Sequence, residues 1–186
     1  MTEWDSETAE WYAANYGEYP TNSLAVDELD LPADAVIIDV GCGTGSVLRH
    51  AASRVTRGSL IGIDPVPRMI EIAREQTVDH PGSARIEFRE GSAEKLPVDD
   101  DVASYVFAFD SIDHWQNVEQ GFSEIRRVLR TGGRLVIVKD GGVPGAKEAR
   151  RDFVSTVEGA GFVVADQREL NAKGISFALW TCVEGD

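Results

Sequence analysis

Three alternating glycines between an apolar run and a predicted helix form the part of this chain best suited to chemistry. The run Val36–Val40 is β-branched apart from its single acid, Asp39, and such a run predicts a buried parallel strand. The glycines that follow it are Gly41, Gly43 and Gly45. They let the backbone turn sharply and approach a ligand closely. A helix predicted at Val47–Ala52 would point its N-terminal N–H groups back at this loop, so the pattern predicts a nucleotide-type site.

A second apolar run, Leu60–Asp64, ends in an acid one helix length after the loop, as a β-α-β unit requires. An acid at this strand end accepts hydrogen bonds from both hydroxyls of a nucleoside ribose. Asp64 is also placed to cap a helix predicted at Pro67–Gln76, because Asp before Pro is a common helix start. The two roles are compatible. The dinucleotide fingerprint has its last glycine where this chain has Ser46, which weighs against NAD or FAD.

Five segments in sequence order resemble the class I S-adenosylmethionine-dependent methyltransferases, of the type 11 family. They read VIIDVGCGTGS (36–46), GIDPVPRMIEIAR (62–74), EGSAEKLP (90–97), FAFDSIDHW (107–115) and EIRRVLRTGGRLVIV (124–138). Five ordered matches are more specific than one glycine loop. The resemblance implies S-adenosylmethionine as cofactor and methyl transfer to a nucleophilic atom of a small-molecule acceptor. The acceptor itself has no signature in the sequence.

The resemblance also implies which residues contact the cofactor. They are Asp39, Gly41, Gly43, Gly45, Asp64, Pro65, Met69, Ser92, Ala93 and Phe109. In the family, the acid equivalent to Asp39 lies near the α-amino group of the ligand, and the segment around Ser92 and Ala93 contacts adenine. Ser92 stands where the family usually has an aspartate, which replaces a charged acceptor by a weaker neutral one. Structural alternatives are that Asp39 accepts hydrogen bonds from loop amides, that Met69 packs in a helix core and that Ser92 caps a turn.

The candidate catalytic residues are His114, Asp110 and Tyr16. Asp110, Asp113 and His114 follow a strand predicted at Tyr105–Phe109, and ligands in such sheets bind outside the carboxyl ends of the strands. Because histidine accepts a proton near neutral pH, His114 is the candidate general base. The alternatives are a structural histidine and solvated loop acids.

The beginning of the chain is predicted to be helical over residues 5–19, with Tyr12 and Tyr16 on one face. The resemblance implies that this helix is a lid over the ligand. Core packing of the two tyrosines is the alternative.

The remaining pattern predicts an α/β fold with a doubly wound, seven-stranded, mostly parallel sheet, helices on both faces and an antiparallel last strand. The predicted helices are Gln116–Leu129, ended by Arg130–Gly133, and Lys147–Glu158, and the predicted strands are Arg134–Lys139, Phe162–Ala165 and Ile175–Val183. We expect one domain over residues 1–186, with lid helices at 1–30 and a core at 34–186. Only the short segment Asp140–Ala146 joins a strand to the next helix. This predicts either an open acceptor pocket or one closed by the N-terminal helix and a second subunit, as in a homodimer.

The net charge and the residue composition indicate which kinds of binding partner to expect. The net charge of −14 argues against nucleic acid, because phosphate binding needs a basic surface. We expect no membrane association, no metal site and a cytoplasmic setting, since there is no membrane-length apolar run, no leader and no metal-type spacing of Cys or His. The acid excess with few lysines fits a salt-adapted organism and an ordinary acidic bacterial protein equally. Two other functions stay open: a non-catalytic S-adenosylmethionine-binding module and an NAD-dependent oxidoreductase.

Overall fold

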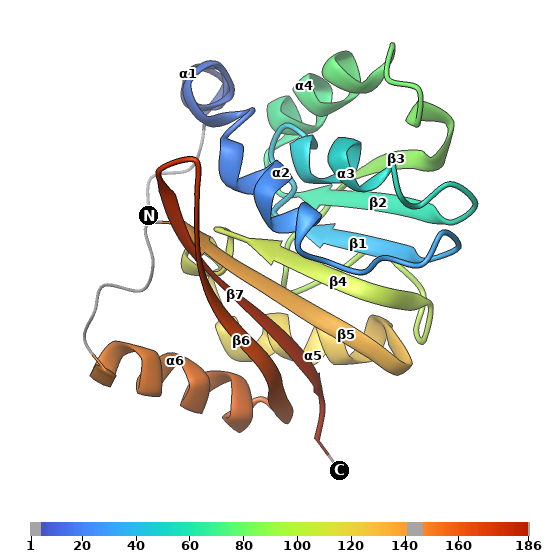
Figure 1. Cartoon of the computed structure of the whole chain (residues 1–186). Coiled ribbons are helices and arrows are strands. Elements are labelled where there is room, and N and C mark those ends of the chain that lie inside the picture. Colours follow the sequence, from blue (N-terminus) through green and yellow to red (C-terminus); the bar gives the residue numbers. More distant parts are fainter. Residues whose placement is uncertain (1–4, 141–146, 186) are drawn as a thin grey trace.

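A seven-stranded sheet forms the centre of the computed structural model, which describes residues 5–140 and 147–185 (Figure 1). The strands lie in the order β3-β2-β1-β4-β5-β7-β6. They are β1 (Val36–Val40), β2 (Ser59–Asp64), β3 (Ile86–Glu90), β4 (Ala103–Phe109), β5 (Leu129–Asp140), β6 (Phe162–Ala172) and β7 (Ile175–Glu184). Strand β7 pairs antiparallel with both β5 and β6, and the other pairings are parallel. The predicted fold class is therefore confirmed.

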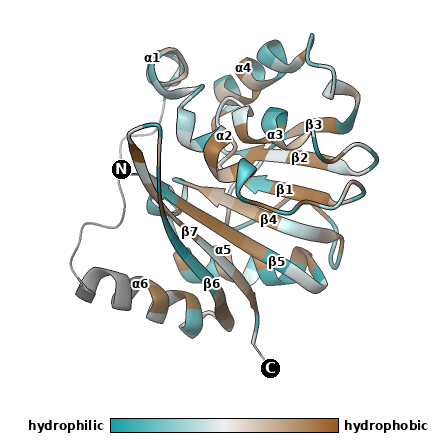
Figure 2. Cartoon of the chain, viewed as in Figure 1, coloured by the Kyte–Doolittle hydropathy of each residue, from teal (hydrophilic) through white to brown (hydrophobic). Residues whose placement is uncertain are grey.

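Helices cover both faces of the sheet and bury two separate apolar clusters (Figure 1). The helices are α1 (Ser6–Tyr16), α2 (Pro20–Asp27), α3 (Ser46–Ala51), α4 (Pro67–Thr77), α5 (Val118–Val128) and α6 (Lys147–Gly159), with 3-10 turns η1 (Ser83–Arg85) and η2 (Ile112–His114). Residues of α2, α3 and α4 belong to one cluster, and residues of α5 and α6 belong to the other. Hydropathy follows this arrangement, because the central strands are hydrophobic and the edge strand β6 is hydrophilic over much of its length (Figure 2).

Three predicted elements differ from the structure. The helix predicted over residues 5–19 ends early, as α1 at Tyr16, and a second helix, α2, begins at Pro20, which occupies its first turn and favours a helix start. The helix ends before Arg130 as predicted, but Arg130–Gly133 belongs to a strand, since β5 begins at Leu129 and runs through it, with a register shift against β4 and Gly132 in the left-handed region. Helix α5 therefore ends one residue earlier than predicted.

The third difference concerns the last two strands. The predicted strand Phe162–Ala165 extends to Ala172, where it pairs with Ile175 at the start of β7. Lys173 and Gly174 join the two strands and both have positive φ, of 53° and 81°, as a two-residue hairpin turn requires. The predicted segment Asp140–Ala146 lies, from residue 141 on, outside the described residues.

Candidate functional site

The glycine loop between β1 and α3 has a left-handed backbone at each glycine, with φ of 77° at Gly41, 51° at Gly43 and 77° at Gly45. A Cβ on Gly41 would lie 2.5 Å from the Cβ of Ser111, and one on Gly45 would lie 2.5 Å from Phe88. Glycine is therefore required at these two positions for two reasons: a side chain would clash with its neighbours, and the backbone is left-handed. A Cβ on Gly43 would meet only Tyr12, at 3.9 Å. Gly45 packs against Phe88 of β3 and is not among the residues that line the cavity described below, and its contact with the cofactor stays a prediction.

Asp39 is buried at the floor of the site, with 1 % of its surface exposed. Neither carboxylate oxygen has a hydrogen-bond partner among the described residues. The alternative that Asp39 accepts hydrogen bonds from loop amides is therefore wrong. Burial, assisted by the negative charge of Asp64, raises the pKa of Asp39 to about 8. A buried acid without partners is costly and favours a polar partner from outside the chain.

Asp64, and not Asp39, accepts hydrogen bonds from backbone N–H groups. The Gly43 N–H donates to Asp64 Oδ2 at 3.0 Å, and the Val66 N–H donates to Asp64 Oδ1 at 2.9 Å. The N-cap of α4 is Val66, not Asp64, so the predicted capping role is wrong in its position. Burial raises the pKa of Asp64, and the two backbone hydrogen bonds oppose that shift. The carboxylate therefore fixes the geometry of the glycine loop.

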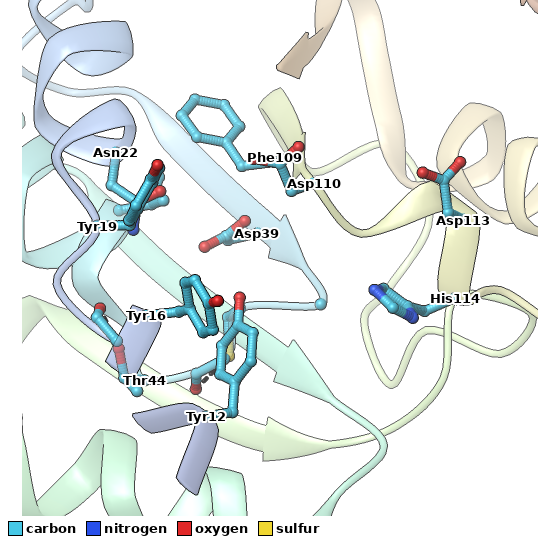
Figure 3. A pocket seen from close by; sticks show the side chains of 15 residues that line it. Tyr12, Tyr16, Tyr19, Asn22, Asp39, Thr44, Phe109, Asp110, Asp113 and His114 are labelled. Carbon is cyan, nitrogen blue, oxygen red and sulfur yellow. Dashed lines mark hydrogen bonds between the residues drawn. The ribbon is translucent and has the colours of Figure 1, made fainter. Parts of the chain in front are cut away.

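A cavity of about 370 Å³ lies between this loop, the N-terminal helices and the end of β4. It is lined by Tyr12, Tyr16, Gly17, Tyr19, Asn22, Asp39, Gly41, Cys42, Gly43, Thr44, Val47, Phe109, Asp110, Asp113 and His114. Figure 3 shows the three tyrosines on one side, Asp113 and His114 on the opposite side, and Asp39 between them. The structure thus brings Tyr16, Asp110 and His114 together around one cavity, although Tyr16 is far in sequence from the other two.

Asp110 and Asp113 have distinct local surroundings at the end of β4. Asp110 has a positive φ of 50°, and its N–H donates to the Val138 carbonyl at 2.9 Å. A left-handed residue that is not glycine is uncommon and stores modest strain, which is found most often at functional sites. Asp113 forms an ion pair with Lys139 of β5. His114 completes the turn η2.

The adenosine half of the predicted cofactor set lies outside this cavity. Pro65, Met69, Ser92 and Ala93 do not line it, and neither does Asp64. Met69 is buried in α4, as in the core-packing alternative. Ser92 begins a turn in which the Lys95 N–H donates to the Ser92 carbonyl at 3.1 Å. These residues nonetheless follow β2 and β3, the strands beside β1, so they continue the same edge of the sheet.

The joint between α1 and α2 is anchored to the glycine loop, a feature that the sequence did not reveal. The Thr44 hydroxyl donates to the Gly17 carbonyl at 2.7 Å, and the Ser46 hydroxyl donates to Glu18 at 3.1 Å. Arg49, which is buried, forms an ion pair with Glu18 and donates to the Thr44 carbonyl at 2.6 Å. Ser46 therefore helps to hold the joint between α1 and α2 against the glycine loop. No local spacing predicts this cluster, because Glu18 and Arg49 are 31 residues apart.

The N-terminal helix α1 covers the cavity with few buried contacts of its own, since Ala9 is its only buried residue. Its outer attachment is an ion pair between Glu10 and Arg68 of α4. Elements with few buried apolar contacts open at low free-energy cost. The few buried contacts of α1 are compatible with the predicted lid, which stays a prediction.

Comparison with known protein families identifies the family to which this chain belongs. The model of a methyltransferase domain matches residues 38–137, more than half of the chain. The chain belongs to this methyltransferase family. This match confirms the predicted resemblance and S-adenosylmethionine as the cofactor of the class, and it decides against the NAD-dependent alternative.

Individual relatives agree with the family match. Methyltransferase GfsG of Streptomyces halstedii is 34 % identical over 124 residues, which cover 67 % of this chain and 44 % of that protein. The ubiquinone/menaquinone biosynthesis C-methyltransferase UbiE of Geobacter sp. (strain M21) is 34 % identical over 120 residues, which cover 62 % of this chain and 50 % of that protein. The chain thus spans about half the length of these curated relatives.

Solved structures show the same fold. A SAM-dependent methyltransferase from Aquifex aeolicus superposes with a TM-score of 0.77 at 19 % identity and covers 97 % of this chain and 100 % of that one. A putative methyltransferase of Haloferax volcanii, solved with the Trm112 methyltransferase activator, gives a TM-score of 0.78 at 20 % identity, with 98 % of each chain covered. Within the described residues, no helix has the length and apolar character needed to cross a membrane, and no group of three or more His, Cys, Asp or Glu is arranged to hold a metal ion.

Proposed function

We propose that this chain transfers a methyl group from S-adenosylmethionine to a nucleophilic atom of a small-molecule acceptor. The observation that carries the proposal is the unpartnered carboxylate of Asp39 at the floor of a cavity beside the bare backbone of Gly43. A cationic amino group is the natural partner for such a carboxylate, because a buried charge needs pairing. S-adenosylmethionine carries an α-amino group and no phosphate, which suits an acid better than a phosphate ligand would.

The residues present fit this cofactor. Asp39 would accept hydrogen bonds from the amino group, and Asp64, already oriented by two backbone N–H groups, would accept them from the ribose hydroxyls. The remaining predicted contacts are Gly41, Gly43 and Phe109 toward the amino acid end, and Pro65, Met69, Ser92 and Ala93 toward adenine. When bound, the cofactor supplies an electrophilic methyl group on a sulfonium sulfur.

The chain's own contribution is positioning and exclusion of water. In this proposal residues 1–30 form the lid and residues 34–186 the core, with Tyr16 of α1 over the cavity and Asp110 on its opposite wall. His114 would take the proton that the acceptor gives up, directly or through one water. Alignment of an acceptor in a closed site accounts for a large part of the barrier reduction in such reactions.

A non-catalytic module that binds S-adenosylmethionine is the second candidate. The neutral Ser92 at the predicted adenine corner supports it, because a neutral acceptor there holds the adenine amino group more weakly than the aspartate usual in the family. The names of the curated relatives suggest a quinone-type acceptor as one possibility for catalysis.

Two measurements test the proposal in sequence. Calorimetry should detect binding of S-adenosylhomocysteine and no binding of NADH at matched concentrations. Transfer from methyl-labelled S-adenosylmethionine should then label at least one member of a chemically diverse acceptor panel. Binding without any transfer would favour the module, and absence of S-adenosylhomocysteine binding would overturn both candidates.

A further inference from the structure

Arg49 of α3 is a buried cation whose guanidinium contacts three separate parts of the chain. Its Nη1 donates to the Thr44 carbonyl at 2.6 Å and to the Thr77 hydroxyl, at the end of α4, at 3.2 Å. Its Nη2 donates to Gln76 Oε1 at 3.2 Å and forms the ion pair with Glu18. A planar guanidinium with five N–H donors is suited to bind several acceptors at once. One side chain thus connects the glycine loop, α4 and the joint between α1 and α2, which comprises residues 17–19.

Thr44 connects Arg49 to the wall of the cavity. Its carbonyl accepts the Arg49 hydrogen bond, and its buried hydroxyl donates to the Gly17 carbonyl at 2.7 Å. A Cβ on Gly17 would lie 2.8 Å from Thr44 Cγ2, so the backbone of the joint packs directly against this side chain. Thr44 (Figure 3) and Gly17 both line the cavity. A displacement of the guanidinium would therefore move two parts of the cavity wall.

Two charged side chains hold neighbouring residues of the glycine loop. Asp64 accepts a hydrogen bond from the Gly43 N–H at 3.0 Å, and Arg49 donates to the carbonyl of the next residue, Thr44. Asp64 is the residue assigned above to the ribose hydroxyls, whereas Arg49 and Glu18 are not among the residues that line the cavity. Arg49 would therefore influence a bound cofactor through the loop and the joint rather than by contact with it.

The ion pair between Arg49 and Glu18 is better suited to fix the joint than to stabilise the fold. The side chain of Glu18 is 59 % exposed, and ion pairs with an exposed partner contribute little to the free energy of unfolding. Helix α1, which precedes the joint, has a single buried residue, Ala9. Its place over the cavity therefore depends strongly on the position of the joint.

We propose that Arg49 is a positioning residue for methyl transfer, which holds the glycine loop and the joint in the arrangement that seats the cofactor beneath α1. The inference rests on the function proposed above and on the predicted lid, and it assigns no contact with the reacting atoms to Arg49. Because coupling between two sites is reciprocal, a cofactor seated by the loop should in turn stabilise α1 over the cavity. Cofactor binding and closure of α1 should therefore weaken together when the pair of Arg49 and Glu18 is disrupted.

Glu18→Gln tests this coupling at the exposed partner. The amide oxygen can still accept from Arg49 and the amide nitrogen can donate to the Ser46 hydroxyl, so the substitution removes the charge and keeps the shape. Asp27→Asn is the matched control, because exposed Asp27 of α2 forms an ion pair with Arg54 and does not line the cavity. Calorimetry should show S-adenosylhomocysteine affinity about fivefold weaker in Glu18→Gln and unchanged in Asp27→Asn.

Hydrogen exchange of the α1 amides separates positioning from a structural role. Saturating S-adenosylhomocysteine should slow their exchange about tenfold in the wild-type protein and in Asp27→Asn, and only about twofold in Glu18→Gln. A loss of stability alone would speed exchange by the same factor with and without ligand, and would leave the slowing unchanged. Arg49→Lys keeps the charge but not the planar donors, so it should reproduce both effects of Glu18→Gln.

The outcomes distinguish this inference from the proposed function. Equal S-adenosylhomocysteine affinities of Glu18→Gln and Asp27→Asn, or equal slowing of exchange in α1, would overturn the role of Arg49 and leave methyl transfer standing. Absence of S-adenosylhomocysteine binding by the wild-type protein would overturn both. Denaturant unfolding checks that each variant is folded, and Glu18→Gln decides alone if Arg49→Lys is not.

Discussion

The unpartnered carboxylate of Asp39 predicts that cofactor binding depends on pH. Its pKa of about 8 means that, in the free protein, about half of Asp39 is ionised at pH 8 and about one part in a hundred at pH 6. If the bound amino group needs the ionised acid, S-adenosylhomocysteine affinity should fall about fifty-fold between pH 8 and pH 6. At pH 7 about nine-tenths of Asp39 is protonated in the free protein, so binding should release about 0.9 of a proton per molecule. Ionising Asp39 at this pH lowers the binding free energy by about 1.4 kcal/mol.

Calorimetry in two buffers of different ionisation enthalpy measures both quantities. Asp39→Asn is isosteric and cannot ionise, so its affinity should be weaker at pH 8 and nearly flat over the same range. A flat profile in the wild-type protein, or an equally steep one in Asp39→Asn, would refute the reasoning.

The same pKa has a consequence for stability in the absence of ligand. The pKa of Asp39 is raised on folding from 3.8 to about 8, so the folded state holds a proton that the unfolded state has lost. The contribution of Asp39 to the free energy of unfolding is therefore highest below pH 4 and falls as the pH rises toward 8. Asp39→Asn should remove this loss, and denaturant unfolding at pH 5 and pH 8 measures the difference between the two proteins.

Four further substitutions test other parts of the structure. His114→Ala should lower the turnover number and leave S-adenosylhomocysteine affinity unchanged; unchanged turnover would exclude it as the base. Asp64→Ala should weaken S-adenosylhomocysteine binding by about 2 kcal/mol in a folded protein, measured by calorimetry. An unaltered dissociation constant would mean that Asp64 only accepts hydrogen bonds from the loop amides. Gly45→Ala should destabilise the fold by roughly 3 kcal/mol, because it adds a clash with Phe88 to left-handed strain, whereas Gly132→Ala, with open space around it, should cost only the strain of about 1 kcal/mol. Denaturant unfolding of both glycine variants measures this, and equal losses would show that the clash is relieved.

Local sequence predicted much of the sheet correctly, and the errors lie in strands whose extent depends on distant parts of the chain. The glycine loop and the strands on either side of it lie where the pattern placed them, because β-branched runs and glycine preferences act within a few residues. The turn predicted at Arg130–Gly133 lies inside β5, between Leu129, which pairs with Ala103, and Arg134, which pairs with Tyr105, so the glycines form an irregularity within the strand. The extension of β6 to Ala172 likewise depends on its partner β7.

The sequence by itself predicted an acid at or near the carboxyl end of each of two neighbouring parallel strands. Asp39 and Asp64 each lie at or next to the carboxyl end of a strand, and β1 and β2 are parallel neighbours in register. Only the tertiary structure decided how these acids differ. Asp64 accepts hydrogen bonds from the N–H groups of Gly43 and Val66, whereas the buried Asp39 has no hydrogen-bond partner in the part of the chain that the structure describes. Hydrogen-bond directions and burial arise from contacts between residues far apart in the chain, and residue spacing carries no record of them.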